Sequence, residues 1–318
     1  MDRTHSQPSA PDLNALSLPD LAARFLENGL IRQMLILARD EDLGNPMRDV
    51  TGELMFGKRD ERRVRMVMRE PGVVAGLAFV EEIVDVFTST REAIGVSLRV
   101  HDGDAVDKGT VLLEMSGNAR AIVRIERTML NLVSRMSGIA TGTKKYVDLV
   151  AGTKARICDT RKTTPGHRLI EKYAVRCGGG TTHRIGLFDA VLIKDNHIAG
   201  LSDDELGVKL ERAAERARDG GNDLWFVQVE VDRLSQLERV LALPSGLIDM
   251  VLLDNMDPET LREAVVMRDR SGKSLLLEAS GGVNEKTLRP IAETGVDRIS
   301  IGGLTHQAVS LDIGLDAV

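Results

Sequence analysis

Hydrophobic and polar positions follow two patterns along the chain, and the first pattern, between residues 18 and 118, is mixed. Residues 19–39 have the apolar spacing of a helix, whereas residues 63–69 alternate polar and apolar side chains with the period of two that a half-buried strand shows. Residues 100–114 resemble the hairpins of biotinyl and lipoyl carrier domains, but Lys108 does not stand where the carrier lysine would, which favours a structural hairpin. This part is therefore expected to combine helices with a partly exposed sheet.

A long helical segment follows at residues 119–150. Its apolar side chains recur at three- and four-residue steps and form one stripe, and Arg127 lies off that stripe. Gly138 and Gly142 are expected to kink the helix or to separate two helices.

Beyond this helix the second pattern begins, in which apolar runs alternate with helical segments. The runs are residues 155–158, 190–193, 225–229, 250–253, 274–277 and 298–301. Near-continuous apolar strands that alternate with helices are typical of parallel β/α units whose sheet is covered on both faces. Six such runs predict an α/β fold with a barrel of six or seven strands, and an open doubly wound sheet is the alternative.

Charged and glycine-rich residues follow these runs. Because the carboxyl ends of barrel strands meet at one edge, we expect these residues to form a site there. The segment 154–197 carries nine lysines and arginines against four acidic residues, in a chain whose net charge is −6. Guanidinium groups pair well with carboxylates and phosphates, so the segment predicts an anionic substrate, and a solvated charged surface is the alternative. The candidate anion-binding residues are Arg161, Lys162, His183, Arg184 and Lys194.

Acidic and glycine-rich strand ends complete the predicted site. Glu230 and Asp254 are candidate Mg²⁺ ligands, acting directly or through water or substrate, although they could instead cap helices or pair with lysines. The glycines of residues 280–282 and 302–303 would let backbone N–H groups approach a phosphate, and ordinary turns are the alternative.

Composition excludes several classes of protein. An aromatic content of 3% and an acidic net charge argue against nucleic-acid binding, and no stretch of the chain is apolar over the ~18 residues that a membrane span requires. Cys158 and Cys177 are too few for a disulfide framework and lack metal-ligand spacing, so reduced thiols and a cytoplasmic location are expected. The polar segment Met1–Asp20 is expected to be a disordered lead.

Eight sequence blocks resemble the signature of the quinolinate phosphoribosyltransferase family, and their order and spacing hold from about Glu41 to His306. The blocks are Glu126–Asn131, Thr160–Gly166, His183–Arg184, Leu192–His197, Glu230–Asp232, Leu253–Asn255, Glu278–Gly282 and Ile301–His306. His167 departs from the apolar or aromatic residue that is common at its position, which leaves no predicted site residue in doubt.

The resemblance implies an amino-terminal α/β sandwich domain, residues 21–129 with 308–318, and an incomplete α/β barrel catalytic domain, residues 130–307. It implies transfer of the phosphoribosyl group of phosphoribosyl pyrophosphate to quinolinate, with decarboxylation and with Mg²⁺ as cofactor. It also implies a homodimer with shared active sites, alone or as a trimer of dimers.

Roles for individual residues are carried over from the same resemblance. Quinolinate would be held by Arg161, Lys162, His183, Arg184 and Lys194, together with Arg127 of the partner subunit. Glu230 and Asp254 would face the ribose and Mg²⁺, and the catalytic residues would be Lys162, Lys194, Glu230 and Asp254. The 5′-phosphate would be held by Ser280, Gly282, Gly302 and Gly303, and Gly281 and Ile301 would be further substrate-binding residues.

Three other functions compete with this interpretation. Lys194 or Lys162 could form a Schiff base in a barrel aldolase. A paralogue associated with molybdenum transport could bind an oxyanion without this activity. A nicotinate phosphoribosyltransferase is a nearer alternative, but a mono-acid substrate would not require so many cations.

Overall fold

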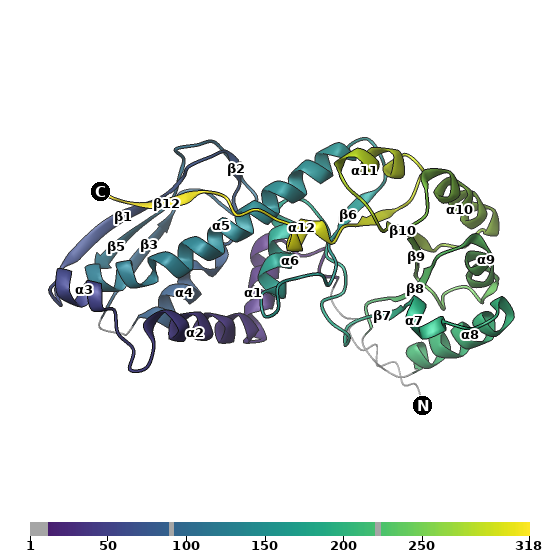
Figure 1. Ribbon diagram of the computed structural model, residues 1–318, viewed down its shortest axis with the longest axis horizontal. Coiled ribbons are helices and arrows are strands. Elements are labelled where there is room, and N and C mark those ends of the chain that lie inside the picture. Colours follow the sequence, from purple (N-terminus) through teal and green to yellow (C-terminus); the bar gives the residue numbers. More distant parts are fainter. Residues whose placement is uncertain (1–11, 89–91, 220–223) are drawn as a thin grey trace, which may run out of the picture. The chain divides into compact units, whose positions relative to one another are not determined.

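The computed structural model describes residues 12–88, 92–219 and 224–318. The chain divides into two compact units, and each is described by itself. The barrel unit comprises Met1–Ala15, Tyr146–Arg161 and Thr181–Gly302, and the sandwich unit comprises Leu16–Lys145, Lys162–Gly180 and Gly303–Val318. Figure 1 labels the helices and strands of both units.

The sandwich unit contains a four-stranded antiparallel sheet in the order β12-β1-β5-β3. Its strands are β1 (Glu61–Met68), β3 (Ile94–Leu98), β5 (Val111–Asn118) and β12 (Ile313–Ala317), and β2 (Gly72–Val73) pairs with β4 (Ala105–Val106). Its helices are α1 (Leu18–Glu27), α2 (Leu30–Leu43), α3 (Val50–Met55), η1 (Leu77–Phe79), α4 (Val80–Phe87), α5 (Ala119–Leu149, assigned to this unit up to Lys145), α6 (Arg168–Cys177) and α12 (Gly303–His306).

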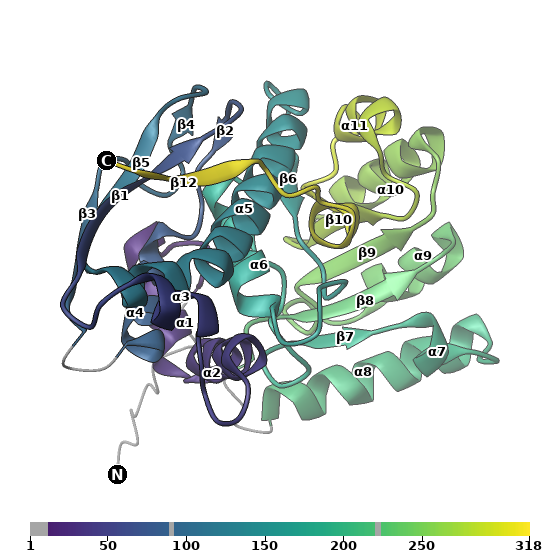
Figure 2. The same ribbon diagram turned by 60° about the vertical axis from the view of Figure 1, so that its left-hand side comes forward.

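The strand predicted for residues 63–69 is confirmed by β1, but its alternation holds only to Met66, where the register shifts and Val67 and Met68 are both buried. Val64 and Met66 are buried and lie opposite the buried Met115 and Leu113 of β5, so the apolar set of both strands occupies one face. Helices α2, α4 and α5 are drawn on one side of this sheet in Figure 2.

The single helix expected at residues 19–39 is wrong, because two helices occupy this stretch. Helix α1 ends at Glu27, and Gly29 precedes α2 with a φ of 75°, a left-handed conformation that favours glycine. Asn28 Oδ1 accepts a hydrogen bond from the N–H of Leu30 at 2.9 Å. Helix α1 begins at Leu18, so the end of the lead that was expected to be disordered is helical, while residues 1–11 lie outside the described part.

A second helix after the glycines of this segment is wrong, since α5 is continuous from Ala119 to Leu149. A Cβ at position 138 would lie 1.9 Å from the carbonyl oxygen of Val309, so the glycine there allows close packing of backbone against the helix. Gly138 therefore serves tertiary contact, which a single sequence cannot distinguish from a helix break.

The barrel unit is built around a parallel sheet whose described part has six strands in the order β6-β11-β10-β9-β8-β7. The strands are β6 (Arg156–Cys158), β7 (Val191–Ile193), β8 (Val227–Val231), β9 (Met250–Asp254), β10 (Leu276–Ser280) and β11 (Arg298–Ser300). The helices are α7 (Asp195–Ile198), α8 (Asp203–Asp219), α9 (Leu234–Ala242), α10 (Pro258–Ser271) and α11 (Glu285–Ala292).

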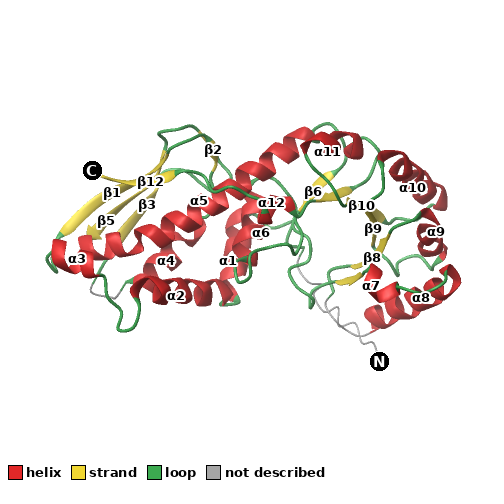
Figure 3. Cartoon of the chain, in the orientation of Figure 1, coloured by secondary structure: helices red, strands yellow, loops and turns green. Residues whose placement is uncertain are grey.

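The predicted incomplete α/β barrel is confirmed. Helices α8 to α11 follow one another around the outside of the sheet, as Figure 3 shows, and β8 is buried along its whole length. In the described residues β6 and β7 are not paired with each other, so the barrel is open between them; only Thr181 forms an isolated parallel bridge to Cys158.

Two further features concern the environment of the protein. Both cysteines are buried and free, and burial raises the pKa of the Cys158 thiol to about 11, so this thiol stays protonated. Within the described residues, no helix has both the length and the apolar character that crossing a membrane requires.

Candidate active site

The carboxyl ends of the barrel strands carry most of the predicted site residues. Asp254 ends β9 and pairs in register with Ser280, which ends β10. Lys194 directly follows β7, and Glu230 is the last residue but one of β8. Because all these strands are parallel, their ends meet at one edge of the sheet. This edge, called here the barrel rim, consists of Arg161, Arg184, Lys194, Glu230, Asp254, Ser280–Gly282 and Ile301–Gly302.

An ion pair joins two of the rim residues. Lys194 Nζ lies 2.5 Å from Glu230 Oε2, and the Glu230 side chain is 10% exposed. Partial burial and the negative charge of Glu230 raise the pKa of Asp254, although Asn255 and Lys194 oppose this shift. Glu230 is therefore close enough to disfavour the ionisation of Asp254 on the neighbouring strand, even with a lysine beside them.

Two arginines repel each other in the same way. Burial of the Arg184 side chain and the positive charge of Arg161 lower the pKa of Arg184, and the charge of Asp189 opposes the change. Arg184 Nη1 donates to the carbonyl oxygen of Ala190 at 3.3 Å, which fixes the side chain without neutralising it. Two cations close enough to influence each other in this way favour a nearby anion.

His183 lies in a buried polar network inside the barrel unit. Its Nδ1 accepts a hydrogen bond from the N–H of Arg184 at 2.8 Å, so the proton resides on Nε2. Nε2 lies 2.8 Å from Gln228 Oε1 and 3.5 Å from Glu278 Oε1. Both ring nitrogens therefore have partners within the protein, and this geometry suits a histidine that supports Arg184 better than one that binds a carboxylate directly.

Glu278 was expected to follow its strand at the rim, but it lies within β10 and is fully buried. Its Oε2 accepts a hydrogen bond from Arg298 Nε at 3.0 Å. Burial alone would raise the pKa of Glu278, but electrostatic interactions with His183 and with the Arg298 guanidinium lower it below its ordinary value. The apolar run was predicted to end at residue 277, but strand β10 continues to Ser280. Glu278 and Arg298 therefore form an ion pair inside the barrel unit.

The loop after β10 contains a close backbone approach. Gly281 has a φ of 94°, and a Cβ there would lie 2.1 Å from Asn255 Oδ1 and 2.9 Å from the backbone nitrogen of Asn255. Asn255 itself has a φ of 54° and is the one non-glycine residue with positive φ in the described ranges. The loops after β9 and β10 are therefore in close contact, and only glycine fits at position 281.

Three predicted site residues, Lys162, Gly303 and Arg127, belong to the sandwich unit. The carbonyl oxygen of Lys162 accepts a hydrogen bond from Thr305 Oγ1 at 2.6 Å, and Gly303 opens α12. Arg127 is exposed on α5, as the apolar stripe predicted.

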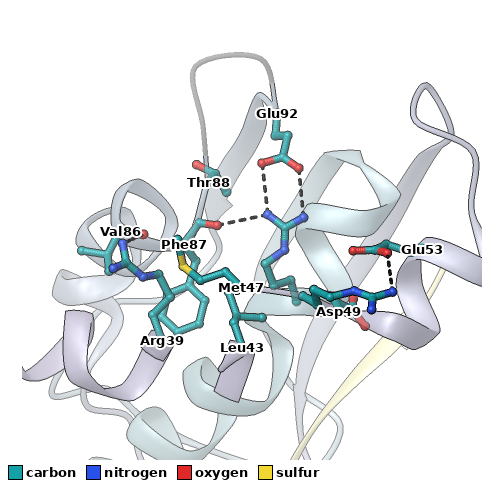
Figure 4. Close-up of a pocket in the computed structure, with 11 residues that line it drawn as sticks. Arg39, Leu43, Met47, Asp49, Glu53, Val86, Phe87, Thr88 and Glu92 are labelled. Carbon is teal, nitrogen blue, oxygen red and sulfur yellow. Dashed lines mark hydrogen bonds and ion pairs between the residues drawn. The ribbon is translucent and has the colours of Figure 1, made fainter. Parts of the chain in front are cut away.

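A pocket of the sandwich unit, shown in Figure 4, is also rich in arginine. Arg124 forms a two-pronged ion pair with Glu92, with hydrogen bonds of 3.1 and 3.0 Å. Arg48 lies 3.5 Å from Glu53, and Arg39 lies 2.7 Å from Asp40. Each arginine of this pocket faces a carboxylate, so the pocket offers less positive charge to a ligand than its composition suggests.

Sequence reasoning missed the residues that support the rim from inside. Gln228 is a polar residue in the middle of an apolar strand, and that position was a usable signal. Asp189 accepts hydrogen bonds from the N–H groups of Ile185 and Gly186, at 2.6 and 2.9 Å, and nothing in a single sequence marks it. Across the described residues no group of three or more His, Cys, Asp or Glu side chains could hold a metal ion by itself.

Comparison with known proteins assigns the chain to one family along most of its length. Residues 49–137 match the profile of quinolinate phosphoribosyl transferase, N-terminal domain, and residues 139–316 match that of the C-terminal domain. A probable nicotinate-nucleotide pyrophosphorylase [carboxylating] of Bacillus subtilis is 40% identical over 276 residues, which cover 87% of this chain and 89% of the relative. A Mycobacterium leprae nicotinate-nucleotide pyrophosphorylase [carboxylating] is 45% identical over 251 residues, covering 79% and 84%.

A solved structure agrees with these matches. The nicotinate-nucleotide pyrophosphorylase of Francisella tularensis superposes with a TM-score of 0.77 at 33% identity, and the match covers 97% of this chain and 100% of that one.

Proposed function

The chain belongs to the quinolinate phosphoribosyltransferase family, and we infer that it transfers the phosphoribosyl group of phosphoribosyl pyrophosphate to quinolinate. The products are nicotinate mononucleotide, pyrophosphate and carbon dioxide, and the reaction belongs to NAD biosynthesis. The observation that carries this conclusion is 40% identity over 87% of the chain to a relative named for the same reaction. The curated relatives give no support to the alternative of an oxyanion-binding paralogue without this activity.

We propose that the cations of the barrel rim bind the two carboxylates of quinolinate. Arg161 and Arg184 repel each other, and a dianion would relieve that repulsion. Lys194 adds a third cation from the end of β7. The family resemblance adds Lys162 and Arg127 of a second copy of the chain to this set. His183 would act through Arg184, because its ring nitrogens have partners within the protein.

We propose that phosphoribosyl pyrophosphate binds along the ends of β8 to β11. Glycines 281, 282, 302 and 303 leave the backbone open to the 5′-phosphate, with Ser280 and Ile301 beside them. Glu230 and Asp254 would face the ribose. As pyrophosphate departs, the ribose carbon gains positive character, which these carboxylates stabilise electrostatically.

Glu230 and Asp254 also fit Mg²⁺, which commonly binds one or two protein carboxylates together with substrate oxygens and water. The charge of Glu230 already raises the pKa of Asp254, and a cation at this place would relieve the repulsion between the two carboxylates. When bound, Mg²⁺ would neutralise charge on the pyrophosphate leaving group.

The bond-forming step needs no nucleophilic side chain. The quinolinate nitrogen attacks the ribose carbon as pyrophosphate leaves, and the pyridinium charge that results stabilises the carbanion left when the adjacent carboxylate departs as carbon dioxide. This carbanion then takes up a proton from solvent. The rim residues contribute by holding the two substrates in this geometry. Lys162 and Lys194 would stabilise negative charge during the reaction; a Schiff base at either lysine is not required.

We also propose a homodimer with shared sites, alone or as a trimer of dimers, because Arg127 is exposed and off the core stripe of α5. A cytoplasmic location is proposed on the basis of the two unpaired thiols.

One assay tests the proposed function. Purified protein is given quinolinate, phosphoribosyl pyrophosphate and Mg²⁺, and nicotinate mononucleotide is quantified by chromatography, with nicotinate as the comparison substrate. Product from quinolinate at a rate at least about tenfold above that from nicotinate is expected, because the second carboxylate is a charged contact. No product, or equal use of nicotinate, would overturn the assignment.

A further inference from the structure

The segment Thr181–Gly186, which contains His183 and Arg184, runs beside β6 where the barrel is open. Thr181 still follows the strand pattern, since its N–H donates to the carbonyl oxygen of Ile157 at 2.8 Å and its own carbonyl oxygen accepts from Asp159 N–H at 3.1 Å. Beyond Thr181 the described sheet provides this segment with no further strand pairing.

Side chains, and not a further strand, accept the hydrogen bonds of the backbone N–H groups that follow. The N–H of His183 donates to Asp159 Oδ1 at 2.8 Å, and the N–H of Arg184 donates to His183 Nδ1 at 2.8 Å. Asp189 accepts from the next two N–H groups. Buried backbone N–H groups must find partners, so these side chains determine where the segment lies.

Thr182 completes the series, and its partner lies 168 residues away in the chain. Asn14 Oδ1 accepts from the N–H of Thr182 at 2.7 Å, and Asn14 Nδ2 donates to the carbonyl oxygen of Thr182 at 3.0 Å. A single amide thus satisfies both backbone groups of a fully buried residue, as a neighbouring strand would.

The amide of Asn14 is itself held in place. The N–H of Asn14 donates to Asp12 Oδ1 at 2.9 Å, and the N–H of Ala15 donates to the carbonyl oxygen of Asp12 at 2.9 Å. This turn presents the amide to Thr182 in one orientation.

We propose that Asn14 is a positioning residue of the active site. By holding Thr182, it fixes the backbone of the next two residues, His183 and Arg184, and thereby the guanidinium group at the barrel rim. Asn14 lies outside residues 49–316, which the family profiles match. The role rests on the proposed function, because it is the binding of quinolinate by Arg184 that Asn14 would support.

The chemistry of the contact specifies which side chains can replace Asn14. An acceptor and a donor are both needed, so alanine removes two hydrogen bonds. Aspartate keeps the acceptor but turns a carboxylate oxygen toward the carbonyl oxygen of Thr182, which replaces an attraction by a repulsion. Asn14→Asp is therefore expected to be at least as damaging as Asn14→Ala.

The test measures steady-state kinetics of the full chain with each substrate varied in turn. For Asn14→Ala, the KM for quinolinate is expected to rise about three- to tenfold, the loss expected for one or two hydrogen bonds. The KM for phosphoribosyl pyrophosphate is expected to stay within about twofold, because its proposed contacts lie on β8 to β11.

Ser17→Ala is the matched control. Ser17 Oγ caps α1 by accepting from the N–H of Asp20 at 3.3 Å, so its loss weakens a nearby structural contact that does not involve Thr182. The control should leave both KM values unchanged while lowering the thermal midpoint.

The possible results separate the two proposals. If the wild-type chain forms no product from quinolinate, the proposed function fails. If the wild type is active and Asn14→Ala leaves the KM for quinolinate within about twofold, the positioning role alone is overturned. A parallel rise of both KM values with a fall in thermal midpoint would also overturn it, since that pattern indicates general destabilisation.

Discussion

The charges of the antiparallel sheet in the sandwich unit and those of the barrel rim follow opposite arrangements. Glu114 of the antiparallel sheet lies 2.8 Å from both Arg65 and Arg99, and hydrogen bonds from Arg99 and then Arg65 lower its pKa. At the rim, Arg161 helps to lower the pKa of Arg184, and Glu230 helps to raise that of Asp254. Like charges held close to one another cost stability, so their presence marks a place prepared for a ligand.

Sheet topology explains the difference. In an antiparallel sheet, residues on adjacent strands lie directly opposite each other, so opposite charges can pair across the strands. In a parallel sheet, every strand delivers its carboxyl end to the same edge, so charged residues that follow the strands gather there. Charged side chains thus pair across the strands of the antiparallel sheet, whereas at the rim like charges also gather beside the ion pair of Lys194 with Glu230.

The largest expected effect concerns Arg127, which belongs to the sandwich unit but differs from the paired arginines of its antiparallel sheet. It is exposed, and in the described ranges it forms no ion pair, unlike the arginines around Glu114. Arg127→Ala should abolish turnover and leave the thermal midpoint unchanged, because the residue would act in the site of a partner subunit. Activity and thermal unfolding of the purified variant check this.

Mixing Arg127→Ala with Lys162→Ala sharpens the same prediction. After subunit exchange, half of the dimers are mixed and each regains one whole site, so about one quarter of wild-type activity should return. No recovery after exchange has been verified by mass spectrometry would contradict shared sites.

The next prediction compares the loss of one arginine from the barrel rim with the loss of one paired arginine from the antiparallel sheet. Arg184→Ala should lower kcat/KM for quinolinate at least about 100-fold, because it removes a partly buried charge from the proposed carboxylate site. Arg65→Ala, which removes a paired arginine from the antiparallel sheet, should leave kcat/KM within about twofold. Comparable losses in both variants would refute the distinction between paired and opposed charges.

A smaller effect is expected at the phosphate loop. Gly281→Ala should raise the KM for phosphoribosyl pyrophosphate about tenfold, since the new methyl group would displace Asn255 and move the loop. Gly109→Ala is the matched control, because Gly109 has a similar φ of 90° but open space around its Cβ position. If both alanine variants behave alike, backbone strain and not the close approach to Asn255 explains the result.

The buried pair of Glu278 and Arg298 is a third arrangement, with opposite charges enclosed together. The pKa of Glu278 is lowered in the folded protein, so its ionised form contributes stability above the unfolded value of about 4.3 and loses it as pH falls through the folded pKa. Glu278→Gln should cost about 3–5 kcal/mol at pH 7, and the difference from wild type should shrink below about pH 4. Urea unfolding at several pH values measures this, and a pH-independent difference would speak against a charged Glu278.

The barrel strands and the charged residues at their ends could be predicted from the sequence. Apolar runs located the six described strands of the barrel unit, and Lys194, Glu230 and Asp254 lie at the edge where parallel strands were expected to bring them. Periodicity reports which face is buried, and the parallel topology then places the strand ends together.

Features that depend on distant contacts could not be predicted. Glu278 resembles the other charged strand ends, yet the strand continues past it and Arg298 neutralises it inside the barrel unit. Gly138 looks like a helix breaker because its partner, the carbonyl oxygen of Val309, is remote in sequence. Asn14 lies in a segment expected to be disordered, and only the contact with Thr182 reveals its importance.

A crystal structure with quinolinate bound would test directly whether the neighbouring cations of the barrel rim bind a dianion. One carboxylate is expected to lie within hydrogen-bond distance of Arg184, and Arg161 and Lys194 are expected to contact the same molecule. Quinolinate bound elsewhere, or Arg161 and Arg184 turned away from it toward protein carboxylates, would contradict the account.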